Sequence, residues 1–277
     1  MITLRNLSFG YHAHRTVLDG IDLTLTPGHI YGLLGKNGEG KTTLLKVWSG
    51  LLFPQKGDCR VNGENPALRE AAFLEKLFFL PEEILLPDVT AGEYFRMCAP
   101  FYPTFSQEIL KTAIEAFEVD RASRLQSLSL GQKKKVAIAF ALAVHTPILL
   151  MDEPTNGLDI PSKTIFRQLL ATYLGEEQTV LISTHQVRDL ESLIDTVVIL
   201  HNKRILLNRT LTAISQHLFF RPVASDEKVL YAEPTPYGAI GTGRNQNGEE
   251  TPVSLELLFN AAISHPEEIT SIFLEKK

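Results

Sequence analysis

A glycine-rich segment near the beginning of the chain has the residues needed to bind phosphate groups. It follows the apolar stretch 30–34 and has the spacing G-x-x-x-x-G-K-T. Glycine lets the backbone approach a phosphate closely, and N–H groups at the start of a following helix bind anions. The lysine supplies charge to the β- and γ-phosphates, and the threonine hydroxyl is a ligand for Mg²⁺. These residues predict a nucleoside triphosphate site made of Gly35, Lys36, Asn37, Gly38, Glu39, Gly40, Lys41, Thr42 and Thr43.

Two further motifs lie downstream. Leu128-Ser129-Leu130-Gly131-Gln132 precedes a predicted helix, and the apolar run 148–151 ends in Asp152-Glu153-Pro154, followed by Asn156-Gly157-Leu158-Asp159. Asp152, at the end of a predicted strand, is placed to hold Mg²⁺. In this order, and over roughly the first 210 residues, the motifs resemble those of the ATP-binding cassette (ABC) family.

The resemblance implies roles for several other side chains. Glu153 corresponds to the base that polarises the attacking water. His185, at the end of a predicted strand, corresponds to the histidine that contacts the γ-phosphate and positions the water. Tyr11 corresponds to the aromatic residue that stacks on adenine. Glu82 stands where the family usually has glutamine, and we expect it to contact Mg²⁺ and report to a membrane partner.

The resemblance also implies a site shared between two chains. In the family, the segment that corresponds to Ser129, Gly131 and Gln132 begins a helix whose N-terminus faces the nucleotide of an opposing subunit. Leu130 replaces the commonest glycine, a departure that we expect to be tolerated. Asp159 resembles the loop residue that couples the two sites across the dimer.

The resemblance implies the ATP-hydrolysing subunit of an ABC transporter. The compact insertion, the Leu80-Pro81-Glu82 loop and the tail 253–260 look similar to those of bacterial export-type subunits. ATP and Mg²⁺ are the expected cofactors, and a second ATP-binding subunit, identical or different, is expected to form a head-to-tail dimer that drives a separate integral-membrane permease. The alternative is a soluble ABC-type ATPase of a machine such as iron–sulfur cluster assembly. A DNA-repair ATPase is disfavoured because residues 43–128 contain no sustained heptads and no cysteine pair.

Composition narrows the choice of partners and location. The chain has 277 residues and a formal net charge of −5, whereas a general nucleic-acid binder presents a strongly basic surface, so no nucleic acid is expected. Cys59 and Cys98 lie far apart, which favours buried reduced thiols over a disulfide or metal site. No apolar stretch approaches the ~20 residues that span a bilayer, and no signal peptide is visible. We expect a cytoplasmic protein held at the inner face of the membrane by its permease.

The order of predicted elements indicates an α/β fold of the P-loop NTPase class. Apolar strands alternate with helices, which predicts a mostly parallel central sheet with an N-terminal antiparallel β subdomain and a helical insertion. We expect a nucleotide-binding domain over 1–220, its helical subdomain at about 84–140, and a small α+β extension over 221–277. Short strands are expected at 229–232 and 237–240, a helix at 187–193, and a solvated helix face at 133–135.

Overall fold

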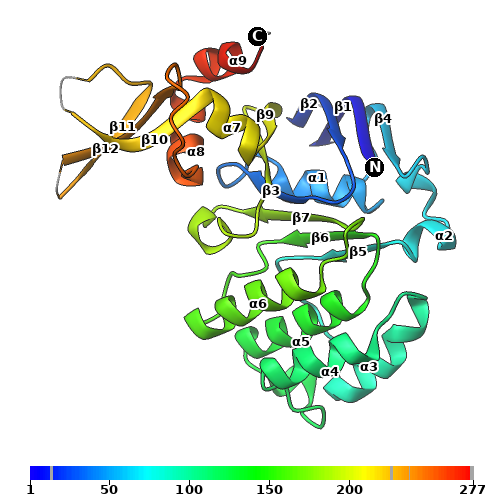
Figure 1. Ribbon diagram of the computed structural model, residues 1–277. Helices are drawn as coiled ribbons and strands as arrows, with labels where there is room; N and C mark the ends of the chain where they lie inside the picture. The colour runs from blue at the N-terminus through cyan, green and yellow to red at the C-terminus, as the bar shows by residue number, and fades with distance from the viewer. Residues whose placement is uncertain (13–14, 225–226, 237, 275–277) are drawn as a thin grey trace.

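A six-stranded sheet forms the centre of the molecule (Figure 1). The computed structural model describes residues 1–12, 15–224, 227–236 and 238–274. The strand order is β5-β6-β7-β3-β8-β9, in which the first five strands are parallel and β9 is antiparallel. The mostly parallel sheet is therefore confirmed. Its strands are β3 (Ile30–Leu34), β5 (Leu77–Leu80), β6 (Ile148–Asp152), β7 (Thr179–Thr184), β8 (Thr196–His201) and β9 (Arg204–Thr210).

The strands of this sheet are apolar on both faces because each face is covered. Side chains alternate between faces along a strand, so Leu149 and Met151 join one hydrophobic cluster while Ile148 and Leu150 join the other. All four are at most 2% exposed. The polar residues Asp152 and Thr184 come at the carboxyl ends of neighbouring parallel strands, so they meet at one edge of the sheet.

A second, antiparallel sheet of order β2-β1-β4 covers one side of the molecule. It packs with α1 against the central sheet, and Trp48 of α1 is fully buried there. The predicted antiparallel β subdomain is therefore confirmed. Its elements are β1 (Ile2–His12), β2 (Arg15–Leu25) and β4 (Lys56–Val61), with α1 over Lys41–Trp48.

Helices cover the opposite face of the central sheet. Between β5 and β6 the chain forms a helical insertion in which Thr90 and Glu93 make a capping box at the start of α3 and Ser106 caps α4. The buried ring of Phe140 is surrounded by aromatic rings, including Phe95 at 6.2 Å and Tyr94 at 5.2 Å. These helices are α3 (Ala91–Cys98), α4 (Gln107–Ala116), α5 (Leu130–Ala143) and α6 (Ile160–Tyr173). The short helix α2 (Ala71–Leu74) precedes β5, and its Phe73 packs in the cluster of α1 and the N-terminal sheet.

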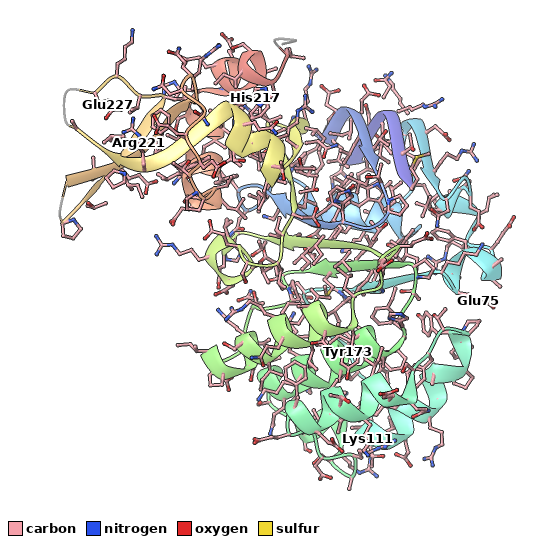
Figure 2. All side chains as sticks on the ribbon, viewed as in Figure 1. Glu75, Lys111, Tyr173, His217, Arg221 and Glu227 are labelled. Atoms are coloured by element: carbon pink, nitrogen blue, oxygen red, sulfur yellow. The ribbon has the colours of Figure 1, made fainter. Side chains whose placement is uncertain are left out.

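The C-terminal part contains a three-stranded antiparallel sheet of order β10-β12-β11, which projects from the body of the molecule (Figure 1). Beside this sheet, Arg221 of β10 and Glu227 of the connection from β10 to β11 lie together and form an ion pair (Figure 2). The expected boundary between 220 and 221 falls inside β10, and Tyr237 of the expected strand 237–240 lies outside the described residues. The elements are α7 (Leu211–His217), β10 (Leu218–Val223), β11 (Tyr231–Thr235), β12 (Gly238–Arg244), α8 (Leu255–Ser264) and α9 (Pro266–Leu274).

The helix predicted over 187–193 is wrong. The segment contains only a single 3₁₀ turn, Val187–Asp189, followed by further i→i+3 hydrogen bonds. Seven residues are too few to stabilise an α-helix by themselves. The turns still bury Val187 and Leu190, which explains the helix-like spacing of the apolar residues.

Both cysteines are free, but only Cys59 is buried as expected, and Cys98 is half-buried. Burial raises the pKa of the Cys59 thiol to about 12. Among the described residues, no helix is long and apolar enough to cross a membrane.

Candidate active site

A cleft of about 890 Å³ lies where the N-terminal sheet, the phosphate-binding loop and the carboxyl ends of the central strands meet. It contains most of the side chains that the sequence predicted for the site. The residues that line it are Tyr11, His12, Arg15, Val17, Asn37, Gly38, Gly40, Lys41, Thr42, Thr43, Glu82, Asp152, Glu153, Asn156 and His185.

The phosphate-binding loop joins β3 to α1 and holds its lysine inside the protein. The Lys41 ammonium donates hydrogen bonds to the carbonyl oxygens of Gly35 at 2.7 Å and Lys36 at 3.4 Å. Burial lowers the pKa of this ammonium, and the nearby carboxylates of Glu153 and Asp152 oppose the shift. Gly40 has φ +109°, and a Cβ there would lie 2.9 Å from a Val17 methyl group, so only glycine fits.

Two oxygen ligands suited to Mg²⁺ lie side by side in the cleft. The Thr42 hydroxyl donates a hydrogen bond of 2.6 Å to Oδ2 of Asp152. The other carboxylate oxygen of Asp152 accepts a hydrogen bond from the Ser183 hydroxyl, which fixes the carboxylate orientation. Asp152 is 1% exposed, and hard carboxylate and hydroxyl oxygens are the ligands that Mg²⁺ prefers, so these residues fit the ion.

Glu153 and His185 form a hydrogen-bonded acid–base pair beside this site. Nδ1 of His185 lies 2.8 Å from Oε1 of Glu153. Glu153 is 5% exposed and has φ +46°, an uncommon left-handed conformation that is held by a hydrogen bond from its N–H to the Ser183 carbonyl. The pair can accept a proton from a water molecule in the cleft.

Glu82 lies in the same cleft, and its contacts reveal two residues that sequence reasoning missed. Its carboxylate accepts a 2.9 Å hydrogen bond from the Asn156 side chain, and its carbonyl accepts one of 3.0 Å from the Lys134 ammonium. The expectation that Lys134 lies on a solvated helix face is wrong, because the residue is 4% exposed. Burial lowers its pKa, and the carboxylates of Glu82, Asp152 and Glu153 oppose the shift. The sequence Lys133-Lys134-Lys135 gives no sign that the middle lysine is the buried one.

Tyr11 lies at the other end of the cleft. Its side chain is 53% exposed, its ring packs edge-on against Phe9 with centroids 5.1 Å apart, and its hydroxyl lies 3.2 Å from the Thr43 hydroxyl. These contacts fix the ring beside the phosphate-binding loop. Glu39, in that loop, faces inward instead and lies 3.3 Å from His201 at the end of β8.

The residues Ser129, Gly131 and Gln132 are not among those that line the described cleft. Ser129 and Gln132 make a capping box at the start of α5 and both are exposed. A Cβ at Gly131 would lie 3.1 Å from the Gly157 carbonyl, so this helix start packs tightly against the loop before α6. Asp159 caps α6 through a 2.8 Å hydrogen bond from the Ser162 N–H. The structure thus places these residues together on a surface outside the chain's own cleft.

Comparison with known proteins identifies the family. The family profile described as ABC transporter matches residues 18–156. The chain is 33% identical to the ABC transporter ATP-binding protein NatA of Bacillus subtilis (strain 168), over 77% of this chain and 91% of that protein. The chain belongs to the ABC transporter family. It is an ATP-binding subunit and an ATPase, as the motifs predicted.

Two further proteins are similar to this ABC subunit, and their similarities extend over different lengths of the chain. A solved structure of an ATP-binding subunit of an ABC transporter matches with a TM-score of 0.70 and 28% identity, over 77% of this chain and 91% of that one. The Nod factor export ATP-binding protein I of Burkholderia orbicola (strain AU 1054) is 29% identical, over 98% of this chain and 88% of that protein. The second similarity extends through nearly the whole chain and therefore includes most of the region after β10.

Besides Lys134 and Asn156, sequence reasoning missed two other contributors to the site of this ABC ATPase, Ser183 and Arg15. Ser183 orients Asp152 and accepts the Glu153 N–H, Asn156 binds Glu82, and Arg15 lines the cleft. Ser183 and Asn156 lie within segments that carry motif residues, so their proximity to the site could have been noticed. Arg15 lies at the start of a strand with no motif, and only the fold brings it to the cleft.

Proposed function

We propose that the chain powers a separate integral-membrane permease as one of two ATP-binding subunits, and that it does so with Mg²⁺. The observation that carries this proposal is the arrangement of Lys41, Thr42, Asp152, Glu153 and His185 in one cleft. The comparisons do not favour the iron–sulfur assembly alternative, because the relatives named above are transporter subunits. The residues through α7 form the nucleotide-binding domain in this proposal, and those from β10 onward form an extension.

In the proposed reaction, Lys41 and the loop N–H groups bind the phosphates, while Thr42 and Asp152 hold Mg²⁺, assisted by Glu82. When bound, Mg²⁺ would neutralise charge on the β- and γ-phosphates. Glu153 accepts the proton of the attacking water, and His185, whose Nδ1 is bonded to Glu153, orients that water and the γ-phosphate. The low exposure of Glu153 and Asp152 keeps bulk water from screening these charges.

The exposed helix start at Ser129 supports a two-chain site. The capping box uses the N–H groups of Ser129 and Gln132, but the Ser129 hydroxyl can still donate a hydrogen bond, and the positive end of the exposed helix suits the triphosphate of a second copy. Leu130 is 84% exposed and Ile160, at the start of α6, is 82% exposed. Two such apolar side chains on one side of the molecule are expected to be covered when a second ATP-binding subunit docks. Asp159, which directly precedes Ile160, would couple the two sites.

A groove between α2, β5 and the helical insertion supports the permease partner. It has a volume of about 540 Å³ and aromatic walls that include Phe78, Tyr94, Phe101 and Tyr102. Phe101 is 71% exposed, so the groove can take an apolar helix. Cys98 also lines it. The permease would place this subunit at the cytoplasmic face of the membrane, and the similarity to a Nod factor export protein favours export.

Alkylation of Cys98 tests the permease proposal directly. Burial raises the pKa of both thiols, but Cys59 is buried whereas Cys98 is half-buried, so Cys59 serves as the less accessible internal control. Co-expression with a candidate permease and purification of the complex should slow alkylation of Cys98 at least about tenfold relative to the free subunit. Equal alkylation rates in free and membrane-extracted protein would contradict docking in this groove.

A further inference from the structure

The extension after β10 packs on the segment that follows His185. That segment leaves β7 at Thr184 and makes a 3₁₀ turn and further single turns before β8 begins, so no regular helix or strand fixes its position. Side-chain contacts must hold it instead. On one side α6 does so, through the 2.6 Å ion pair of Lys163 with Asp189 and a hydrogen bond from Arg167 to the Asp189 carbonyl.

On the other side the segment is held by α8. The Glu191 carboxylate accepts the N–H of Leu255 at 2.7 Å, which places a negative charge at the N-terminus of α8. Arg188 donates to Glu256 at 2.6 Å. Leu255 and Leu258 of α8 are fully buried in the same hydrophobic cluster as Val187 and Leu190.

The contact reaches the active site through Phe259. The Phe259 ring and His185 line one cavity of about 250 Å³, together with Lys36 and Asn37 of the phosphate-binding loop. The imidazole bonds to Glu153 through Nδ1. His185 therefore bonds to the catalytic carboxylate and also lines a cavity to which α8 contributes Phe259.

We propose that α8 positions His185 for ATP hydrolysis, and that Phe259 is its positioning residue. Loss of the ring would enlarge the cavity beside His185 and let the imidazole leave Glu153. The phosphate-binding contacts of Lys41 and Thr42 do not involve α8, so nucleotide affinity should be preserved. The inference rests on the proposed role of His185 and assigns a purpose to the extension.

Kinetic comparison of Phe259→Ala with Phe273→Ala tests this role. Phe273 is a matched control because it is also a partly buried phenylalanine of the extension, but it packs against His217 with ring centroids 5.3 Å apart. Phe259→Ala is expected to lower kcat about tenfold with a change in KM for ATP of less than about twofold, since small misplacement of a catalytic group has this effect. Phe259→Leu should recover most of the activity, and Phe273→Ala should stay within about twofold of the unchanged protein.

A double-mutant cycle separates this inference from the proposed function. In a His185→Ala background, Phe259→Ala should cause no further loss, because its effect passes through the imidazole. If Phe259→Ala lowers kcat by the same factor with and without His185, or leaves kcat unchanged, the positioning role of Phe259 is refuted. The proposed function of the chain would not be affected by either result. Wild-type kcat in His185→Ala would instead contradict the proposed role of His185.

Histidine-selective NMR gives a readout that does not depend on activity. The chain has 8 histidines, and the His185 resonance is identified by its loss in His185→Ala. Phe259→Ala should shift the His185 resonance and leave that of His217 in place, whereas Phe273→Ala should do the reverse. An unmoved His185 resonance would refute the proposal, and Phe259→Val serves for the same comparison if the alanine variant does not fold.

Discussion

Replacement of Glu153 by glutamine isolates proton transfer from every other function of the cleft. The two side chains have the same shape, and the amide oxygen can still accept a hydrogen bond from Nδ1 of His185, now 2.8 Å from the carboxylate. Because both residues carry a Cβ, the backbone conformation at φ +46° is equally disfavoured in each. The folded structure is therefore expected to change little, with a loss of about 1 kcal/mol from the weaker hydrogen bond.

Turnover should fall far more. General-base catalysis contributes roughly 10²–10⁴-fold, which corresponds to about 3–5 kcal/mol on the barrier. ATP binding should persist, since Lys41, Thr42 and Asp152 are unchanged. Phosphate release measures turnover, equilibrium titration measures ATP affinity, and light scattering should detect a dimer that accumulates with ATP. Glu177→Gln, at an exposed position away from the cleft, is the matched control. Turnover within about threefold of the unchanged protein would remove Glu153 from the role of base.

Three other substitutions test separate parts of the site. Ser129→Arg should lower the rate of ATP hydrolysis by more than about 100-fold, because the exposed helix start contacts the nucleotide of a second chain. The ATP affinity of the monomer should change less than about twofold. Normal hydrolysis would argue against a shared site. Glu82→Gln should raise the Mg²⁺ concentration for half-maximal activity by about 2–10-fold through loss of one negative charge, and an unchanged Mg²⁺ titration would place Glu82 outside the metal shell. Lys134→Met tests burial of the Lys134 ammonium. The pKa of this group is lower in the folded protein than in the unfolded chain, so between the folded pKa and about 10.4 the unfolded chain binds more protons. The free energy of unfolding therefore rises with pH in this window. Urea unfolding at pH 7 and 9.5 should show a smaller rise for the methionine variant, and equal slopes would mean that Lys134 is solvated when folded.

Much of the site could be predicted from the sequence because its residues lie at the ends of strands. Gly40, Lys41 and Thr42 follow β3, and Asp152 and Glu153 end or follow β6, so local spacing along the chain already places them at one edge of a parallel sheet. The apolar runs of β3 and β6 were equally informative, since strands covered on both faces have uninterrupted hydrophobic sequences.

Contacts between distant segments could not be predicted in this way. Lys134 has charged neighbours in the sequence, and only the packing of α5 against the Glu82 loop buries it. The segment after His185 has helical spacing of its apolar residues, yet α6 and α8 fix it as a turn. The contact of Phe259 with the cavity beside His185 joins residues 74 positions apart, and no local pattern records it.

The most direct test of a site shared between two chains is a structure of the Glu153→Gln protein with ATP and Mg²⁺. Two copies are expected to face each other head to tail, with the Lys41 of one copy and the Ser129 of the other in contact with the same triphosphate. An ATP-bound dimer in which Lys41 and Ser129 of opposite copies contact no common nucleotide would contradict this account.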